Sequence, residues 1–76
     1  MNNNRRKEIG NVIEQFENLK DILEMIKDDE QESYDNMPEG LQASERGEAS
    51  EAAIDNLDAA LDSFDELISN LSESAV

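Results

Sequence analysis

Apolar residues recur at alternating steps of three and four along the first half of the chain. The positions are Ile9, Val12, Phe16, Leu19, Leu23 and Ile26, and the stripe is widened by Ile13, Ile22 and Met25. This spacing places side chains on one face of an α-helix. The pattern predicts a first helix over about residues 4–34.

The second half repeats the pattern and predicts a second helix over about residues 44–72. Its apolar positions are Ala53, Leu57, Ala60, Phe64, Leu67 and Leu71, broadened by Ile54, Leu61 and Ile68. Three positions in every seven are thus apolar, whereas a two-stranded seam needs only about two in seven. We therefore expect each helix to contact more than one neighbour, as in a four-helix bundle of two hairpins.

The apolar pattern stops between the halves, in a segment that holds the only proline and two of the three glycines. Asn36 favours a turn through its side chain, and Pro38 disfavours helical backbone at the residue before it. The sequence predicts a turn over about residues 35–43. A segment such as Tyr34–Leu41 can cover the end of the helix pair or form a recognition tip for a partner.

The second helix can begin at Pro38, which suits a first helical position, or at Ser44. We favour Ser44, because its hydroxyl can cap the helix and because Glu45 and Glu48 then lie in the positive first turn. Gly47 would lie inside that turn, where glycine costs about 1 kcal/mol relative to alanine. Its presence indicates either fraying or a close backbone approach.

The predicted fold is all-α: a single domain, residues 1–76, forming an antiparallel two-helix hairpin of coiled-coil type that dimerises into a four-helix bundle. A turn near residue 40 makes the numbers of facing residues add up to about 80, which sets Phe16 against Phe64 and Leu23 against Leu57. The residues expected in the helix–helix core are Ile9, Phe16, Leu19, Leu23, Ile26, Leu57, Leu61, Phe64 and Leu71.

The net charge of −14 comes entirely from one part of the chain. Residues 1–27 hold five basic and five acidic residues, whereas residues 28–76 hold one basic and fifteen acidic residues. Such a surface disfavours direct binding of nucleic acid, which needs clustered Lys and Arg, and favours a protein partner with a basic surface. The basic cluster Arg5–Lys7 is expected to pair with the acidic end of the second helix, at Asp65, Glu66 and Glu73.

A row of carboxylates follows the second helix opposite its apolar stripe. Its members are Glu48, Glu51, Asp55, Asp58, Asp62, Asp65 and Glu66. Neighbours in such a row lie about 5–6 Å apart, close to the phosphate spacing along one nucleic-acid strand. The row can therefore act as a mimic of the DNA backbone. The simpler interpretation, which we favour, is a solvated helix face.

The residue types present argue against catalysis and against bound cofactors or metals. The chain has no histidine and no cysteine, which excludes the usual zinc sites, cysteine nucleophiles and proton transfer by imidazole. The turn segment lacks the ligand spacing of a calcium loop. We therefore expect a protein that is not an enzyme and that binds no cofactor and no metal.

The absence of cysteine fits a reducing compartment, and the N-terminal segment has no apolar core of a signal peptide. No stretch approaches the ~20 apolar residues of a membrane span, and an acidic surface is repelled by anionic lipids. We expect a cytoplasmic location without membrane contact.

The segments RRKEI, EQESYDNMPEGLQASERGE and EAAIDNLDAALDSFDELISNL resemble a family of short, acidic helical proteins of Gram-positive phages and prophages. The resemblance implies a phage or prophage accessory protein that binds a host or phage protein, and it supplies no site residues. By analogy, it also raises an alternative: an acidic DNA mimic that inhibits a host nuclease or DNA-binding defence protein. An accessory role in phage assembly or scaffolding is a third possibility.

Overall fold

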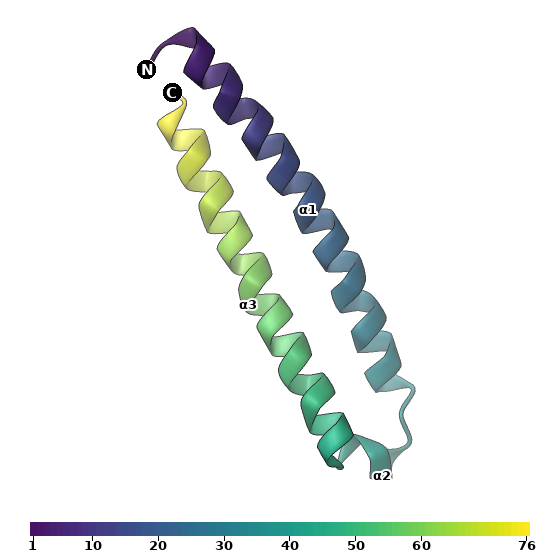
Figure 1. Ribbon diagram of the computed structural model, residues 1–76. Helices are drawn as coiled ribbons and strands as arrows, with labels where there is room; N and C mark the ends of the chain where they lie inside the picture. Colours follow the sequence, from purple (N-terminus) through teal and green to yellow (C-terminus); the bar gives the residue numbers. More distant parts are fainter.

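The computed structural model describes residues 1–76, and all its regular elements are helices. They are α1 (Asn3–Asp35), α2 (Glu39–Gln42) and α3 (Glu45–Ser74). α1 packs along α3, with both chain termini at one end and α2 at the other, so the two long helices run antiparallel (Figure 1). The predicted all-α class is confirmed, as is the packing of one long helix against another. The molecule is a rod that measures 58 × 15 × 12 Å.

The two long helices begin in different ways. Asn2 caps α1, because its side-chain oxygen accepts a hydrogen bond of 2.8 Å from the backbone amide of Arg5. Ser44 precedes α3 in extended backbone, but its hydroxyl donates to the carbonyl oxygen of Leu41 at 2.5 Å and does not cap α3. The side-chain cap expected at Ser44 is thus wrong, while Glu45 and Glu48 do lie in the first turn of α3.

The corner between the long helices uses both of the predicted starting points. Pro38 opens the short helix α2, and Ser44 then precedes α3. Gln42, the last residue of α2, donates a side-chain hydrogen bond of 2.9 Å to the carbonyl oxygen of Tyr34. Gly47 is buried against the same residue, because a Cβ atom at this position would overlap the backbone of Gln42. Of the two explanations for Gly47, the close backbone approach is therefore confirmed.

The seam between α1 and α3 consists of half-buried and buried residues spaced three and four apart. On α1 they are Ile9, Ile13, Phe16, Lys20, Leu23, Lys27, Glu30 and Tyr34, and on α3 they include Ser50, Ile54, Leu57, Leu61, Phe64, Ile68 and Leu71. The rings of Phe16 and Phe64 meet edge to face, with centroids 5.8 Å apart and planes inclined by 62°. The predicted register, in which these two residues face each other, is confirmed.

This seam buries little of the chain. Only Gly47, Ser50, Ile54 and Leu61 are buried, and no large side chain is fully enclosed. Ser50 donates a 2.5 Å hydrogen bond to a carboxylate oxygen of Glu30 on α1. The remaining residues of the predicted core that lie in the seam, Ile9, Phe16, Leu23, Leu57, Phe64 and Leu71, are half-buried. The α1 and α3 pair therefore leaves much of its apolar surface in contact with water.

Leu19 and Ile26 do not lie in the seam where we expected them, since they are 48% and 49% exposed. Lys20 and Lys27 occupy the seam positions instead. Successive residues are about 100° apart around a helix, so turning the lysines toward α3 moves Leu19 and Ile26 to the side. A lysine tolerates such a position because its alkyl stem packs on apolar surface while the ammonium reaches its partner.

Candidate interaction site

One side of the rod is closed by three bonds between α1 and α3, spaced seven residues apart on each helix. They join Lys20 with Asp65, Lys27 with Asp58, and Tyr34 with Glu51. The ammonium of Lys20 lies 2.5 Å from Asp65, and the Tyr34 hydroxyl donates to Glu51 at 2.5 Å. We call this side, defined by the six bonded residues, the bridged flank.

The bonds of the bridged flank stabilise the protonated forms of their donors. The hydrogen bond to Asp65 raises the pKa of Lys20 above its ordinary 10.5, although desolvation opposes the shift. Asp58 raises the pKa of Lys27 in the same way. The hydrogen bond to Glu51 raises the pKa of Tyr34 above 10.0, and desolvation adds to it. All three donors therefore keep their protons into the alkaline range.

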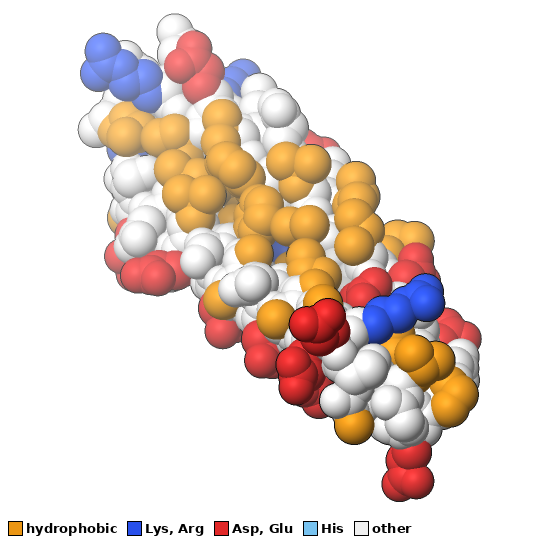
Figure 2. All heavy atoms as spheres, turned by 60° about the horizontal axis from the view of Figure 1, so that its bottom comes forward, with side chains coloured by type: hydrophobic (Ala, Val, Ile, Leu, Met, Phe, Trp, Pro, Cys, Tyr) orange, Lys and Arg blue, Asp and Glu red, His pale blue; other side chains and the backbone are white.

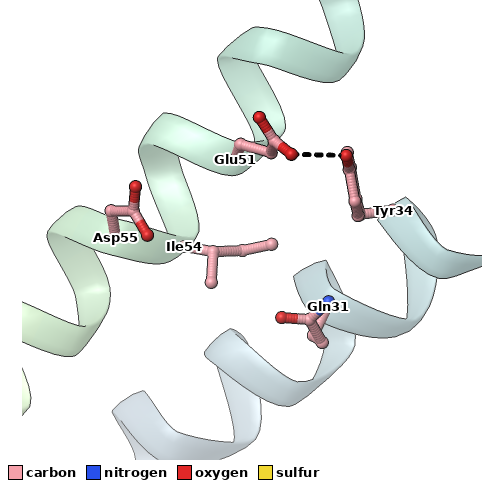
Figure 3. Close-up of a pocket in the computed structure, with 5 residues that line it drawn as sticks. All are labelled: Gln31, Tyr34, Glu51, Ile54 and Asp55. Atoms are coloured by element: carbon pink, nitrogen blue, oxygen red, sulfur yellow. Dashed lines mark hydrogen bonds between the residues drawn. The ribbon is translucent and has the colours of Figure 1, made fainter. Parts of the chain in front are cut away.

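A polar pocket lies beside the last of these bonds. Gln31 and Tyr34 of α1, with Glu51, Ile54 and Asp55 of α3, line a volume of about 350 Å³ (Figure 3). In Figure 3 the Tyr34 ring points across the gap to Glu51, and Ile54 closes the wall between the helices. Because Tyr34 and Glu51 already bond each other, Asp55 is the one carboxylate of the pocket left without a partner.

The predicted acidic row divides into two sets. Glu51, Asp58 and Asp65 belong to the bridged flank and bond α1. The other four are exposed and make neither a hydrogen bond nor an ion pair; they are Glu48, Asp55, Asp62 and Glu66. We call these four the free carboxylates. The row therefore has three members that bond α1 and four that are available to a partner.

The side of the rod opposite the bridged flank is apolar. Its exposed members are Val12, Leu19, Ile22, Ile26 and Leu67, each between 39% and 52% exposed. Beside Leu67, an open groove of about 380 Å³ is lined by Phe16, Ala60, Ser63 and Phe64. Figure 2 shows hydrophobic side chains gathered into a band along one face of the rod. We call this side the apolar flank.

The basic cluster Arg5–Lys7 does not pair with α3 as expected. The ion pairs of the structure are made by Lys20 and Lys27, and Asp65 is bonded to Lys20. Arg6 donates only to the side chain of Asn3, 3.1 Å away on its own helix. The cluster lies at the exposed start of α1 and is available for a contact outside the chain.

Sequence reasoning missed the roles of Lys20, Lys27 and Tyr34. The signal was present, because these residues are spaced by seven and so are the acidic residues that they bond. The apolar pattern hides this signal, because lysine and tyrosine carry polar groups and do not belong to an apolar stripe. Charged residues beside a seam at this spacing are typical of paired helices.

None of the three helices is long and apolar enough to cross a membrane. No group of three or more carboxylates is arranged to hold a metal ion. No protein-family model, curated protein or solved structure matches the chain. The resemblance to short acidic phage proteins therefore stays a prediction.

Proposed function

We propose that this chain is a non-enzymatic protein-interaction module, in which an antiparallel two-helix hairpin pairs with a second copy to form a four-helix bundle. The observation that carries the proposal is the apolar flank, where five large apolar residues remain 39–52% exposed. Soluble monomeric proteins rarely expose a contiguous apolar patch, so a patch of this kind marks a surface that binds another molecule. The bridged flank cannot take this role, because its polar groups already bond each other.

The thin seam supports the same proposal. A chain of this size buries only about 60% of its unfolded surface even when it is compact, and this rod has four buried residues. Disulfides and zinc are not available to a chain without cysteine and histidine. Small folds of this type gain stability by association. A second copy seated on the apolar flank supplies the missing burial.

In such a dimer the free carboxylates stay outside, since Asp55 and Asp62 lie on helix faces turned away from the apolar positions. A row of unpaired negative charge steers a partner with a basic surface toward the module. We propose a host or phage protein as this partner, in the setting of a phage or prophage accessory protein, on the strength of the sequence resemblance.

The alternative is a DNA mimic that occupies the nucleic-acid channel of a nuclease or defence protein. The spacing of the carboxylates in the acidic row favours it, but within that row only the four free carboxylates are unbonded. The mimic predicts an affinity that falls steeply with salt, because association between exposed charges is screened. A partner that stays bound at high salt contradicts the DNA-mimic alternative and is compatible with a general protein-interaction module.

Light scattering after size exclusion at micromolar concentration tests the assembly. We expect twice the mass of one chain for the native protein, and the mass of one chain for a Leu19→Glu, Ile26→Glu variant that remains helical. A native protein with the mass of one chain contradicts the dimer.

Affinity capture from a bacterial lysate tests the acidic surface. The test variant neutralises the free carboxylates, through Glu48→Gln, Asp55→Asn, Asp62→Asn and Glu66→Gln. The matched control neutralises four other exposed acidic residues, through Glu14→Gln, Glu17→Gln, Asp21→Asn and Glu73→Gln. The proposal expects the partner to be lost with the test variant alone. Equal loss in both variants indicates nonspecific attraction to net charge.

A further inference from the structure

We infer that the two copies pack antiparallel, α1 against α1, about a twofold axis at Leu19, with Arg5–Lys7 of each copy beside Asp28–Asp35 of the other. This inference rests on the proposed dimer and specifies its geometry. It follows from three properties of the apolar flank and of the charge distribution.

The first property is that three of the exposed apolar residues of α1 are symmetric about Leu19. Val12 and Ile26 lie seven residues before and after it, so all three share one helix face. A twofold axis at Leu19 sets this residue against its own copy and sets Val12 against Ile26. The same axis brings Ile22 to Phe16, which borders the groove of the apolar flank. Leu19 is also the midpoint of α1, which spans Asn3–Asp35, so the two helices overlap along their whole length.

The second property is that α3 has a matching set at the same level of the rod. The register of the seam, given by Phe16 and Phe64, places Ala60 near the level of Leu19. Ala53 and Leu67 lie seven residues on either side of Ala60. One axis therefore sets Ala60 against its own copy and Leu67 against Ala53. Across α3 small residues meet at the axis and Leu67 faces a small residue, while large apolar residues face each other across α1, so both helices contribute to the contact.

The third property is the distribution of charge along the rod. The half near the turn, residues 20–60, holds three basic and thirteen acidic residues, a net charge of −10. The half near the termini holds three basic and seven acidic residues, a net charge of −4. Antiparallel copies set each −10 half against a −4 half, whereas parallel copies set the two −10 halves together. Coulomb repulsion favours the antiparallel arrangement.

The antiparallel arrangement also gives a partner to the basic cluster. A twofold axis at Leu19 brings Arg5–Lys7 to the level of residues 31–33 of the second copy. The segment Asp28–Asp35 holds five acidic residues, of which only Glu30 and Asp35 make a hydrogen bond within the chain. The cluster and the segment are opposite in charge and exposed at opposite ends of the same helix. A second copy of this chain therefore fits the apolar flank in shape and in charge.

Single cysteine variants test this geometry, because the native chain has no cysteine. We propose Val12→Cys, Leu19→Cys and Ile26→Cys, each treated with a short bis-maleimide linker, with Met25→Cys as the matched control. Met25 is 67% exposed on the outer face of α1. Circular dichroism and light scattering establish that each variant is helical and dimeric before the reaction.

Leu19→Cys is expected to give at least about tenfold more linked dimer than Met25→Cys, since neighbouring sites react at a high effective concentration. Val12→Cys and Ile26→Cys are expected to link poorly alone and efficiently when the two variants are mixed. A dimer in which Val12→Cys and Ile26→Cys each link as well alone as Leu19→Cys overturns the antiparallel geometry but keeps the dimer. Efficient linking of Leu19→Cys to Ala60→Cys, in a mixture of these two variants, overturns the antiparallel geometry in favour of parallel copies. A mass of one chain throughout overturns the inference and the proposed assembly together.

Discussion

Gly47 in the first turn of α3 lies so close to the carbonyl oxygen of Gln42 that a side chain at Gly47 would overlap it. The neighbour is backbone and belongs to the short helix α2, so it cannot move aside as the end of a flexible side chain would. The direction in which the chain leaves α2 and enters α3 therefore depends on the absence of a Cβ atom at this one position.

The substitution Gly47→Ala is expected to lower the free energy of unfolding by about 1–3 kcal/mol, because an added methyl group in a filled space forces backbone shifts. Urea denaturation followed by circular dichroism measures the change. Gly10→Ala is the matched control, since nothing lies within 4 Å of a Cβ atom at Gly10. Gly10 lies inside α1, and this control is expected to raise the free energy of unfolding by up to about 1 kcal/mol. Equal effects at both glycines would contradict the packing explanation.

The bridged flank predicts that stability falls at alkaline pH. The pKa values of Lys20, Lys27 and Tyr34 are raised in the folded chain above the ordinary values of 10.5 for lysine and 10.0 for tyrosine. At a pH between the unfolded and the folded pKa of each group, the folded chain holds more protons than the unfolded chain. The free energy of unfolding therefore decreases as pH rises through this interval. This contribution is fully present below pH 10.0 and is lost as pH passes the raised pKa values.

Urea denaturation at about pH 8 and about pH 11.5 compares the chain below and above the ordinary pKa values of these groups. A variant with Lys20→Met, Lys27→Met and Tyr34→Phe lacks all three groups, and its stability is expected to depend less on pH over this range. The same loss of stability in this variant and in the native chain would show that the alkaline effect arises elsewhere.

The aromatic contact between Phe16 and Phe64 predicts a measurable coupling between the two residues. In a double-mutant cycle with alanine we expect a coupling energy of about 0.5–1.5 kcal/mol, which is typical of edge-to-face pairs. Phe16 with Leu71 is the control pair, because Leu71 is two turns further along α3. Their effects on the free energy of unfolding are expected to add within about 0.5 kcal/mol. Additivity for the aromatic pair would argue against the contact in solution.

Reversing the charge of the basic cluster Arg5–Lys7 is expected to stabilise α1 and to weaken the dimer. The variant Arg5→Glu, Arg6→Glu, Lys7→Glu places acidic residues at the positive end of α1, which favours the helix by roughly 0.3–1 kcal/mol per charge. The proposed dimer loses its contact with Asp28–Asp35 and is expected to dissociate about tenfold more readily. Sedimentation equilibrium measures the dissociation constant. A chain with Asp28→Lys, Asp29→Lys and Glu32→Lys is expected to restore pairing when mixed with this variant, and an unchanged dimer would contradict the contact.

The sequence was sufficient to predict the helical class and the facing of Phe16 and Phe64, because both follow from apolar periodicity and the position of the turn. It was not sufficient to predict which side of α1 faces α3. The apolar stripe of α1 is wider than one seam, so several rotations of the helix bury similar numbers of apolar residues. The bonds of Lys20 and Lys27 to α3 distinguish among these rotations. The seven-residue spacing of these lysines is not part of the apolar pattern, so the apolar pattern alone does not reveal it.

The helix α2 also lay beyond sequence reasoning. Four residues are too few to show a periodicity, and Pro38 and Ser44 each give a valid signal for a helix start. The structure uses both signals in succession, which explains why two starting points were open. Among the carboxylates, the sequence located the row but could not divide it, because the division depends on the rotation of α3 against the lysines and Tyr34.

The rod is 58 Å long and only 15 × 12 Å across, and it encloses no large side chain completely. A single layer of side chains separates its two long helices. If a second copy completes its burial, folding is governed by mass action, and the folded fraction depends on chain concentration. A cell that makes few copies would then hold a larger share of unfolded chains, which proteases remove, whereas abundant synthesis would protect the folded dimer.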